Sequence, residues 1–269
     1  MKSVKRMWAL LVVLAVVFCA APAAAQDRRE SGEADGSYPG RILAADATRY
    51  LALGDSLAAG YLAVPVTKGY VYRLYDNAAF DAIDHTLFAN AAMPGATSSD
   101  VLRYQLPQAL IRPANGGFTP QYVTLTVGGN DLLAILHYIQ TNPDPSTIVP
   151  FATQVITEYG RNLGAILFQL RTGLPGAKIF VANQYALPEI EALVPLAGPM
   201  IAFFNQVVDQ VAAQFPTNVY VVDVHGAFLG RSGLLLGELP GVSPLETHPT
   251  NKGYKVMANA FAAVIAARK

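Results

Sequence analysis

Ser56 lies in a setting that could activate a serine hydroxyl as a nucleophile. It belongs to residues 54–57 (GDSL), which follow a short apolar run at residues 50–53. A serine on a tight glycine-led turn that enters a helix can present its Oγ at the edge of a sheet, where the helix start supplies free backbone N–H groups. The structural alternative is a helix N-cap, a common position for serine. This motif alone does not separate catalysis from capping.

Two further segments could place hydrogen-bond donors beside this serine. Gly95, on a turn within residues 90–97, can offer its backbone N–H without a side chain in the way. Asn130, in residues 128–132 (GGNDL), could direct its side-chain amide into the same space. Taken singly, the first segment is an ordinary turn and the second is a helix-capping asparagine. Neither identifies a site by itself.

His248 is the candidate general base. Pro249 disfavours helical geometry in the residue before it, so we expect His248 on an extended segment just before the last helix. The other histidines, His85, His137 and His225, form no H-x-H or H-x-x-x-H pair, and a histidine metal site is therefore not expected. No glycine-rich phosphate loop of the required form follows the first apolar run, so no nucleotide cofactor is expected.

These residues need a scaffold, and the apolar pattern predicts one. Five runs are apolar or β-branched on both faces, as in strands buried within a parallel sheet: residues 50–53, 85–91, 122–127, 178–182 and 219–223. Helical patterns alternate with them, the clearest at residues 151–171, 199–215 and 251–268. The alternation predicts an α/β fold, a three-layer α/β/α sandwich with a parallel sheet of about five strands, formed by one domain at residues 48–269. Reactive groups in such a sheet collect at the C-terminal ends of the strands.

The first 25 residues have the pattern of a secretory signal peptide. Basic residues precede an apolar run at residues 8–20, and Ala23 and Ala25 fit a signal-peptidase site. An uncleaved membrane anchor is the alternative, but the run is shorter than the roughly 20 apolar residues that a bilayer requires. Residues 26–47 are polar and predict a flexible leader. The prediction is a secreted or periplasmic protein, cleaved near Ala25, with no membrane span left after cleavage.

Composition excludes several classes of protein. The 269 residues are 52% hydrophobic and 14% charged, which argues against disorder. Lys plus Arg and Asp plus Glu both number 19, so nothing indicates a nucleic-acid partner. Removing the signal would also remove Cys19, the only cysteine, and with it any disulfide or thiol chemistry. The sequence leaves the oligomeric state open.

Taken together, the four motifs resemble one family. GDSL at residues 54–57, then Gly95, then GGND at residues 128–131, then His248 occur in the order of the blocks of the SGNH hydrolases, the GDSL lipase/esterase superfamily. The resemblance extends over almost the whole domain. It implies a flavodoxin-like α/β/α fold and hydrolysis of carboxylic esters by a serine nucleophile.

The resemblance also implies a role for each residue. Ser56 would be the nucleophile, and His248 its general base and then the general acid to the leaving alcohol. The backbone N–H groups of Ser56 and Gly95 and the side chain of Asn130 would form the oxyanion hole. Physical chemistry supports these roles, because a serine hydroxyl needs an adjacent base and a tetrahedral oxyanion needs preorganised donors.

One position departs from the family pattern. The family commonly has Asp three residues before the histidine to orient its imidazole, and that position here is Leu245. Glu246, two residues before His248, would point the same way along an extended segment and could reach Nδ1. The alternatives are a backbone carbonyl, which would leave a Ser–His dyad, and Asp223 at the end of the fifth strand.

The substrate is less defined by the sequence. A small-molecule or lipid ester is expected, and the apolar residues 132–139 after Asn130 either line an acyl-chain groove or form a helix packed on the sheet. Prolines at positions 143, 145 and 150 predict that a loop follows residues 132–139. Tyr61, Tyr70, Tyr72 and Tyr75 could instead stack on a sugar, as in carbohydrate acetyl-esterases, or simply pack in the core. An acyltransferase, or a catalytically weak binding module of the same fold, stays open as well.

Overall fold

A computed structural model of the chain describes residues 48–77, 79–80, 87–114, 119–142, 144–185 and 197–269. All of them belong to one compact unit, Ala44–Lys269. The signal peptide and leader predicted at residues 1–47 lie outside the described residues. None of the helices in the described ranges has the length and apolar character that crossing a bilayer requires.

The centre of the fold is a sheet of five parallel strands in the order β2-β1-β3-β4-β5. This is the flavodoxin-like order. Each strand overlaps one of the five apolar runs: β1 (Arg49–Gly54), β2 (Leu87–Asn90), β3 (Tyr122–Thr126), β4 (Lys178–Ala182) and β5 (Val219–Val222). The α/β prediction and the prediction of a parallel sheet are confirmed.

Helices and single helical turns connect the strands. In chain order they are α2 (Ser56–Ala59), η1 (Val66–Lys68), α3 (Tyr70–Asp76), α4 (Ser98–Asp100), η2 (Val101–Gln105), α5 (Leu106–Ala114), α6 (Gly129–Thr141), η3 (Pro145–Thr147), α7 (Ile148–Gly173), α9 (Ala197–Ala212), α10 (Val224–Phe228), η4 (Leu236–Glu238) and α11 (Asn251–Ala266).

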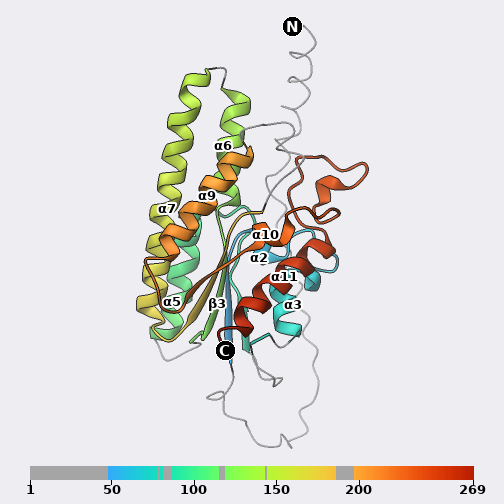
Figure 1. Cartoon of the computed structure of the whole chain (residues 1–269). Helices are drawn as coiled ribbons and strands as arrows, with labels where there is room; N and C mark the ends of the chain where they lie inside the picture. Colours follow the sequence, from blue (N-terminus) through green and yellow to red (C-terminus); the bar gives the residue numbers. More distant parts are fainter. Residues whose placement is uncertain (1–47, 78, 81–86, 115–118, 143, 186–196) are drawn as a thin grey trace, which may run out of the picture. The chain divides into compact units, whose positions relative to one another are not determined.

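Alternate residues of each central strand enter two separate cores, which accounts for the three layers. In β1, Leu51 and Leu53 face the core beneath α5, α6, α7 and α9, while Tyr50 and Ala52 face the core beneath α2, α3, α10 and α11. The two groups of helices lie on opposite sides of the sheet in Figure 1. A strand with apolar residues at every position is thus buried on both faces.

The long helix before β4, α7, begins differently from the sequence prediction. Pro150 lies within the first turn of α7, not in a loop, and α7 begins at Ile148. Proline fits there because the N–H groups of a first turn have no partner within the helix. Pro145 forms the start of η3, and residue 143 is outside the described residues. The loop predicted around these prolines is therefore much shorter than expected.

The strand order brings distant segments to one edge of the sheet. β1 lies between β2 and β3, so the loops that follow these three strands meet at their C-terminal ends. The segment after β5 returns to the same edge, where His248 Nε2 lies 2.8 Å from Ser56 Oγ just after β1, and then enters α11. α6 and the first half of α7 extend beyond this edge (Figure 1).

Candidate active site

The chain makes a sharp turn between β1 and Ser56. Gly54 has a φ of 133°, and a Cβ added there would lie 2.0 Å from the carbonyl oxygen of Thr126 on β3. Only glycine satisfies both constraints. Asp55 then caps α2 by accepting a hydrogen bond from Leu57 N, so Ser56 is the first helical residue and not the N-cap.

Ser56, His248 and Glu246 form a continuous hydrogen-bonded line. Ser56 Oγ lies 2.8 Å from His248 Nε2, and His248 Nδ1 lies 2.5 Å from Glu246 Oε1. Glu246 Oε1 also accepts from the backbone N–H of His248 at 3.1 Å. Burial of Glu246 opposes its ionisation, but the hydrogen bonds from His248 outweigh this and hold the pKa of the carboxyl below its ordinary value.

Contacts from three directions fix the segment that carries His248. Leu236 N donates to His248 O at 2.9 Å, and the Tyr185 hydroxyl donates to Thr247 O at 2.6 Å. The ring of Tyr61 meets the imidazole edge-on, with the ring centroids 4.9 Å apart. Thr250 caps α11 directly afterwards. The imidazole is therefore held in place before any substrate binds.

Gly95 occupies the third position of a tight turn beside Ser56. Ala96 N donates to Met93 O at 3.1 Å, with Pro94 and Gly95 in the central positions. Gly95 has a φ of 82°, as a type II turn requires. An added Cβ would meet no atom within 4 Å, so glycine is needed here for its backbone conformation and not for space. No described residue accepts a hydrogen bond from the N–H of Gly95 or of Ser56.

Asn130 and Asp131 tie the start of α6 to the turn that carries Gly95. Asn130 Nδ2 donates to Ala96 O at 2.8 Å, which leaves its second N–H free to face the site. Asp131 accepts from both Ser98 N, at 3.0 Å, and Ser98 Oγ, at 2.7 Å. Burial raises the pKa of Asp131 despite these hydrogen bonds. The two segments therefore position each other.

The other acidic and histidine candidates have different surroundings. Asp223 is exposed and caps α10, where it accepts from Asn183 Nδ2 at 2.9 Å and from Gly226 N at 2.8 Å. These hydrogen bonds lower its pKa. His225 Nδ1 lies 3.2 Å from Gln184 O, and His137 is exposed on α6. Of the two carboxylates considered from sequence, the structure brings Glu246 to His248.

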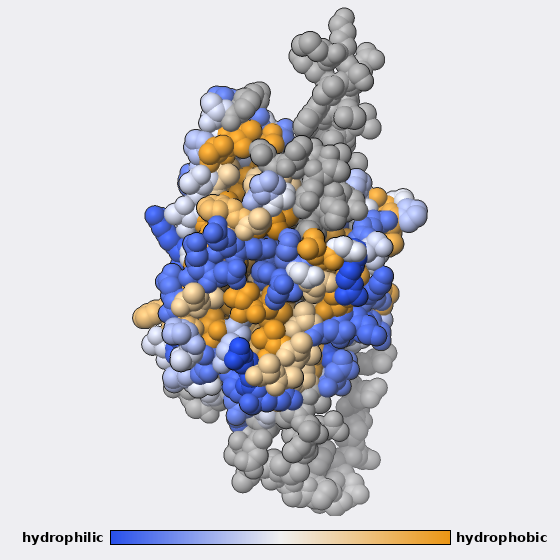
Figure 2. Space-filling view, in the orientation of Figure 1, coloured by the Kyte–Doolittle hydropathy of each residue, from blue (hydrophilic) through white to orange (hydrophobic). Residues whose placement is uncertain are grey.

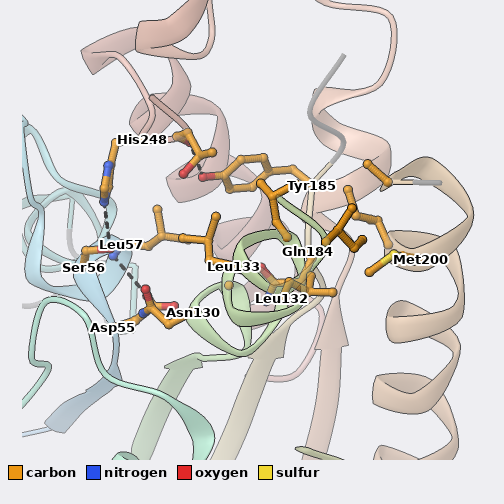
Figure 3. Close-up of a pocket in the computed structure, with 16 residues that line it drawn as sticks. Asp55, Ser56, Leu57, Asn130, Leu132, Leu133, Gln184, Tyr185, Met200 and His248 are labelled. Atoms are coloured by element: carbon orange, nitrogen blue, oxygen red, sulfur yellow. Dashed lines mark hydrogen bonds between the residues drawn. The ribbon is translucent and has the colours of Figure 1, made fainter. Parts of the chain in front are cut away.

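A pocket opens beside Ser56 and runs along α6 toward α9. Figure 3 shows Ser56, His248 and Asn130 at one end and Met200 at the other. Its apolar lining comes from α2, α6 and α9: Leu57, Leu132, Leu133, Leu136, Ile139, Ala197, Met200 and Ile201. Asp55 and Thr247 line it beside Ser56 and His248, and Gln184 and Tyr185 line it as well. Gln184 Nε2 donates to Val127 O, and the Tyr185 hydroxyl donates to Thr247 O.

Several residues of this site were not anticipated from the sequence. Gln184, Tyr185 and Met200 lie far along the chain from Ser56, and no local motif marks them. Asp131 follows Asn130 directly, but its buried bonding to Ser98 depends on a contact 33 residues away. In the described ranges, no three His, Cys, Asp or Glu side chains are grouped so that they could hold a metal ion.

Asp55 is a buried carboxyl whose ionisation costs stability. It is 2% exposed, and burial raises its pKa from 3.8 to about 6, although Leu57 N and Thr126 Oγ1 both donate to it. Between these two pH values the folded protein holds a proton that the unfolded chain has released. The free energy of unfolding therefore falls as the pH rises through this range, and the full cost is present above pH 6.

We expect Asp55→Asn to stabilise the protein at neutral pH. The asparagine oxygen can accept the same two hydrogen bonds without a buried charge. Urea unfolding at pH 8 should show the variant more stable than the wild type by about 2–3 kcal/mol, and this difference should disappear near pH 4. A variant that is less stable than the wild type at pH 8 would show that the ionised carboxylate stabilises the turn.

Comparisons with known proteins give one family and a shared fold. The model of the GDSL-like lipase/acylhydrolase family matches residues 52–256. Among solved structures, a lipase from a goat rumen metagenome has a TM-score of 0.64 and 22% identity, covering 80% of this chain and 96% of its own. No curated protein sequence matches the chain.

Two further solved structures belong to enzymes with different substrates in their names. A phospholipase A1 from Streptomyces albidoflavus NA297 has a TM-score of 0.60 and 22% identity, covering 81% of this chain and 99% of its own. An acetyl xylan esterase from Geobacillus stearothermophilus has a TM-score of 0.57 and 22% identity, covering 81% and 94%. At this identity the neighbours establish the fold, and substrate choice depends on the site.

Proposed function

The chain belongs to the GDSL-like lipase/acylhydrolase family, and from this premise we propose that it hydrolyses carboxylic esters through an acyl-enzyme on Ser56. The observation that carries the proposal is the line from Ser56 through His248 to Glu246 at the mouth of an apolar pocket. His248 Nε2, 2.8 Å from Ser56 Oγ, is within the distance at which a base can take the hydroxyl proton.

The first half of the reaction forms the acyl-enzyme. Ser56 Oγ attacks the ester carbonyl while its proton passes to His248 Nε2, and the tetrahedral oxyanion forms. His248 then gives this proton to the leaving alcohol as the C–O bond breaks. Glu246 stabilises the imidazolium through Nδ1 during these steps.

Three donors would face the oxyanion. They are the N–H groups of Ser56 and Gly95, neither of which donates to another described residue, and the free N–H of Asn130. Such donors act mainly in the transition state, where the negative charge is concentrated on one oxygen. In the second half, His248 activates a water molecule that attacks the acyl-enzyme, and the acid is released from Ser56.

The pocket favours an apolar acyl chain. Leu132, Leu136 and Ile139 follow one another along the face of α6 that lines it, and Met200 lies at its far end. Neither Lys nor Arg is among the lining residues that the structure describes, and the Gln184 amide nitrogen and the Tyr185 hydroxyl already donate to backbone oxygens. Such a lining binds methylene groups by burial and offers few groups to a sugar or an anion.

The length of the groove sets the expected acyl length. From Asn130 to Ile139, α6 rises by about 14 Å. An extended carbon chain has C–C bonds of about 1.5 Å but advances only about 1.3 Å per bond because it zigzags, so about eleven bonds, or a chain of roughly 10 to 12 carbons, cover that distance. Apolar residues continue outward over α6 and the start of α7 in Figure 2, where the exposed large apolar side chains are Leu133 and Val149. We therefore propose esters of medium-length fatty acids as substrates.

A series of p-nitrophenyl esters from acetate to palmitate tests the proposal. We expect kcat/KM to rise from acetate to about the decanoate and then to level off or fall. If the purified protein hydrolyses none of these esters, and an activated fluorophosphonate does not label Ser56, the proposed activity is wrong and the chain is a binding module of this fold.

Narrowing the pocket should change the preferred chain length. Leu136→Trp is expected to lower the ratio of kcat/KM for decanoate over butyrate by at least about tenfold, because the indole occupies the position of the distal methylene groups. Activity on butyrate should change by less than about twofold. His137→Trp, one residue away on the exposed side of α6, is the control and should leave the ratio unchanged. An unchanged ratio in Leu136→Trp would place the acyl chain elsewhere.

The tyrosines that could bind a sugar do not form one platform. Tyr70 is fully buried and stacks on Phe261, with centroids 4.8 Å apart. Tyr72 and Tyr75 pack on Phe88, whereas Tyr61 packs on His248. This arrangement favours packing over carbohydrate recognition. An acyltransferase would share the same acyl-enzyme, and adding an alcohol acceptor to the assay would reveal a second ester product.

We propose that the protein acts outside the cytoplasm, on the basis of the signal-like residues 1–25. Expression of the full chain in a bacterial host and N-terminal sequencing of the exported protein test this. The expected new N-terminus is Gln26. Recovery of the uncleaved chain in the cytoplasm would contradict the proposal.

A further inference from the structure

Gln105 is a buried polar residue that the reaction above does not use. It is 3% exposed and makes two hydrogen bonds to a single residue 51 positions away. Its Oε1 accepts from Gly54 N at 2.8 Å, and its Nε2 donates to Gly54 O at 2.7 Å. The side-chain amide thus pairs with both backbone groups of the residue that ends β1, two positions before Ser56.

Gln105 takes the place of a neighbouring strand. β2 pairs with β1 only as far as Ala52, opposite Asn90. Beyond that point the chain leaves the sheet: Ala91 N still donates to Ala52 O and Met93 N to Gly54 O, but no backbone oxygen of this segment reaches Gly54 N. The Gln105 side chain supplies the missing acceptor in an interior from which water is excluded.

The backbone around Gln105 is unusual in the same place. η2, which Gln105 ends, is a single π-helical turn closed by the hydrogen bond from Leu106 N to Val101 O. Such turns are rare, and they occur often at functional sites. Here the turn joins α4 to α5 while Val101, Gln105 and Leu106 are all buried.

The loop that carries Gly95 is therefore closed on Gly54 from both ends. Met93 N binds Gly54 O just before Gly95, and Gln105 binds both groups of Gly54 after it. Asn130 joins the same unit through Ala96 O. The closure sets where the N–H of Gly95 and the amide of Asn130 lie relative to Ser56.

We propose that Gln105 is a positioning residue for the oxyanion hole: its two hydrogen bonds to Gly54 hold the loop of Gly95 in register with the Ser56 nucleophile. The inference rests on the proposed ester hydrolysis. Gln105 does not touch the substrate and acts through Gly54 and the loop at residues 93–98.

Gln105→Met keeps the size of the side chain and removes both hydrogen bonds. We expect kcat for p-nitrophenyl butyrate to fall by about 10- to 100-fold with KM within about twofold, because the oxyanion donors act in the transition state. In the double variant with Asn130→Ala, the fold-loss of kcat should be far smaller than the product of the two single losses, because both changes damage the same oxyanion hole. A folded Gln105→Met with the kcat of the wild type, or losses that multiply in the double variant, would overturn the proposal.

A matched control is present in the fold. Asn205 on α9 clasps Gln184 in the same way, accepting from Gln184 N and donating to Gln184 O, both at 2.8 Å. Asn205→Leu should lower the melting temperature about as much as Gln105→Met and leave kcat on a short ester nearly unchanged. If both variants lose kcat in proportion to their stability, Gln105 has a structural role only.

Gln105→Glu decides the question if Gln105→Met does not fold. A protonated carboxyl can donate to Gly54 O and accept from Gly54 N, as the amide does, whereas an ionised one can only accept. The ratio of variant to wild-type kcat should therefore fall as the pH rises. A flat ratio would overturn the proposal. If the wild-type protein hydrolyses no ester and a fluorophosphonate does not label it, the proposed ester hydrolysis has failed. If the wild type is active and labelled but the Gln105 variants keep its kcat, only the proposal for Gln105 has failed.

Discussion

Replacing Ser56 with alanine should reduce kcat/KM on p-nitrophenyl esters by about a millionfold, the scale on which loss of a serine nucleophile acts when the base and the oxyanion donors stay in place. Within the described residues, the Ser56 hydroxyl is hydrogen-bonded to His248 Nε2 alone, at 2.8 Å, and the side chain is small. The fold should therefore be unaffected, and the melting temperature should stay within about a degree or two of the wild type.

Two comparisons make this result specific. Ser56→Ala combined with His248→Ala should be no slower than either single variant, since the two residues act as one unit. Ser146→Ala, which alters an exposed serine of η3, should keep full activity and labelling by a fluorophosphonate. Full activity in Ser56→Ala would mean that another residue attacks the ester.

The second large effect concerns Glu246. Glu246→Ala removes the carboxylate that contacts His248 Nδ1 at 2.5 Å, and we expect kcat to fall by about 10³- to 10⁴-fold. The loss arises because the imidazole no longer has a partner that fixes its tautomer or stabilises its positive charge. The lowered pKa of Glu246 keeps this carboxylate ionised in neutral and mildly acidic solution.

Asp223→Ala is the matched control for Glu246→Ala. Asp223 is also a carboxylate after β5, but its hydrogen bonds are to Asn183 and Gly226. We expect its removal to leave kcat within about twofold of the wild type. If Glu246→Ala is nearly as active as the wild type, the site works as a Ser–His dyad. If Asp223→Ala is the impaired variant, Asp223 and not Glu246 is the carboxylate that supports His248.

Much of the scaffold could be predicted because its determinants are local. The central strands β1, β3 and β4 are buried on both faces and the edge strands β2 and β5 are partly buried, so all five appear as mainly apolar or β-branched runs bounded by residues such as Gly54 that break them. Three of the four site motifs follow such strands directly. The type II turn at Gly95 also has a local signal, because Pro94 and Gly95 are the residues that its two central positions favour.

The parts that could not be predicted depend on contacts between distant segments. Gln105 has no motif, and its role follows from where β2 leaves the sheet. Leu245 stands where the family has Asp, so the sequence leaves Glu246, Asp223 and a backbone carbonyl open as the partner of His248, and the structure brings Glu246 to it. Proline breaks helices, so the sequence predicts a loop at Pro150, whereas its position in the first turn of α7 carries no such penalty.

The contact between Ser56 and His248 joins residues 192 positions apart, and this has a consequence for folding. The nucleophile, the oxyanion donors and the groove along α6 all come from the first half of the domain, but the proton acceptor arrives only when the segment before α11 has docked. Contacts of such long range form slowly, because the chain between them must first be ordered. During refolding, the recovery of turnover should therefore mark completion of the domain.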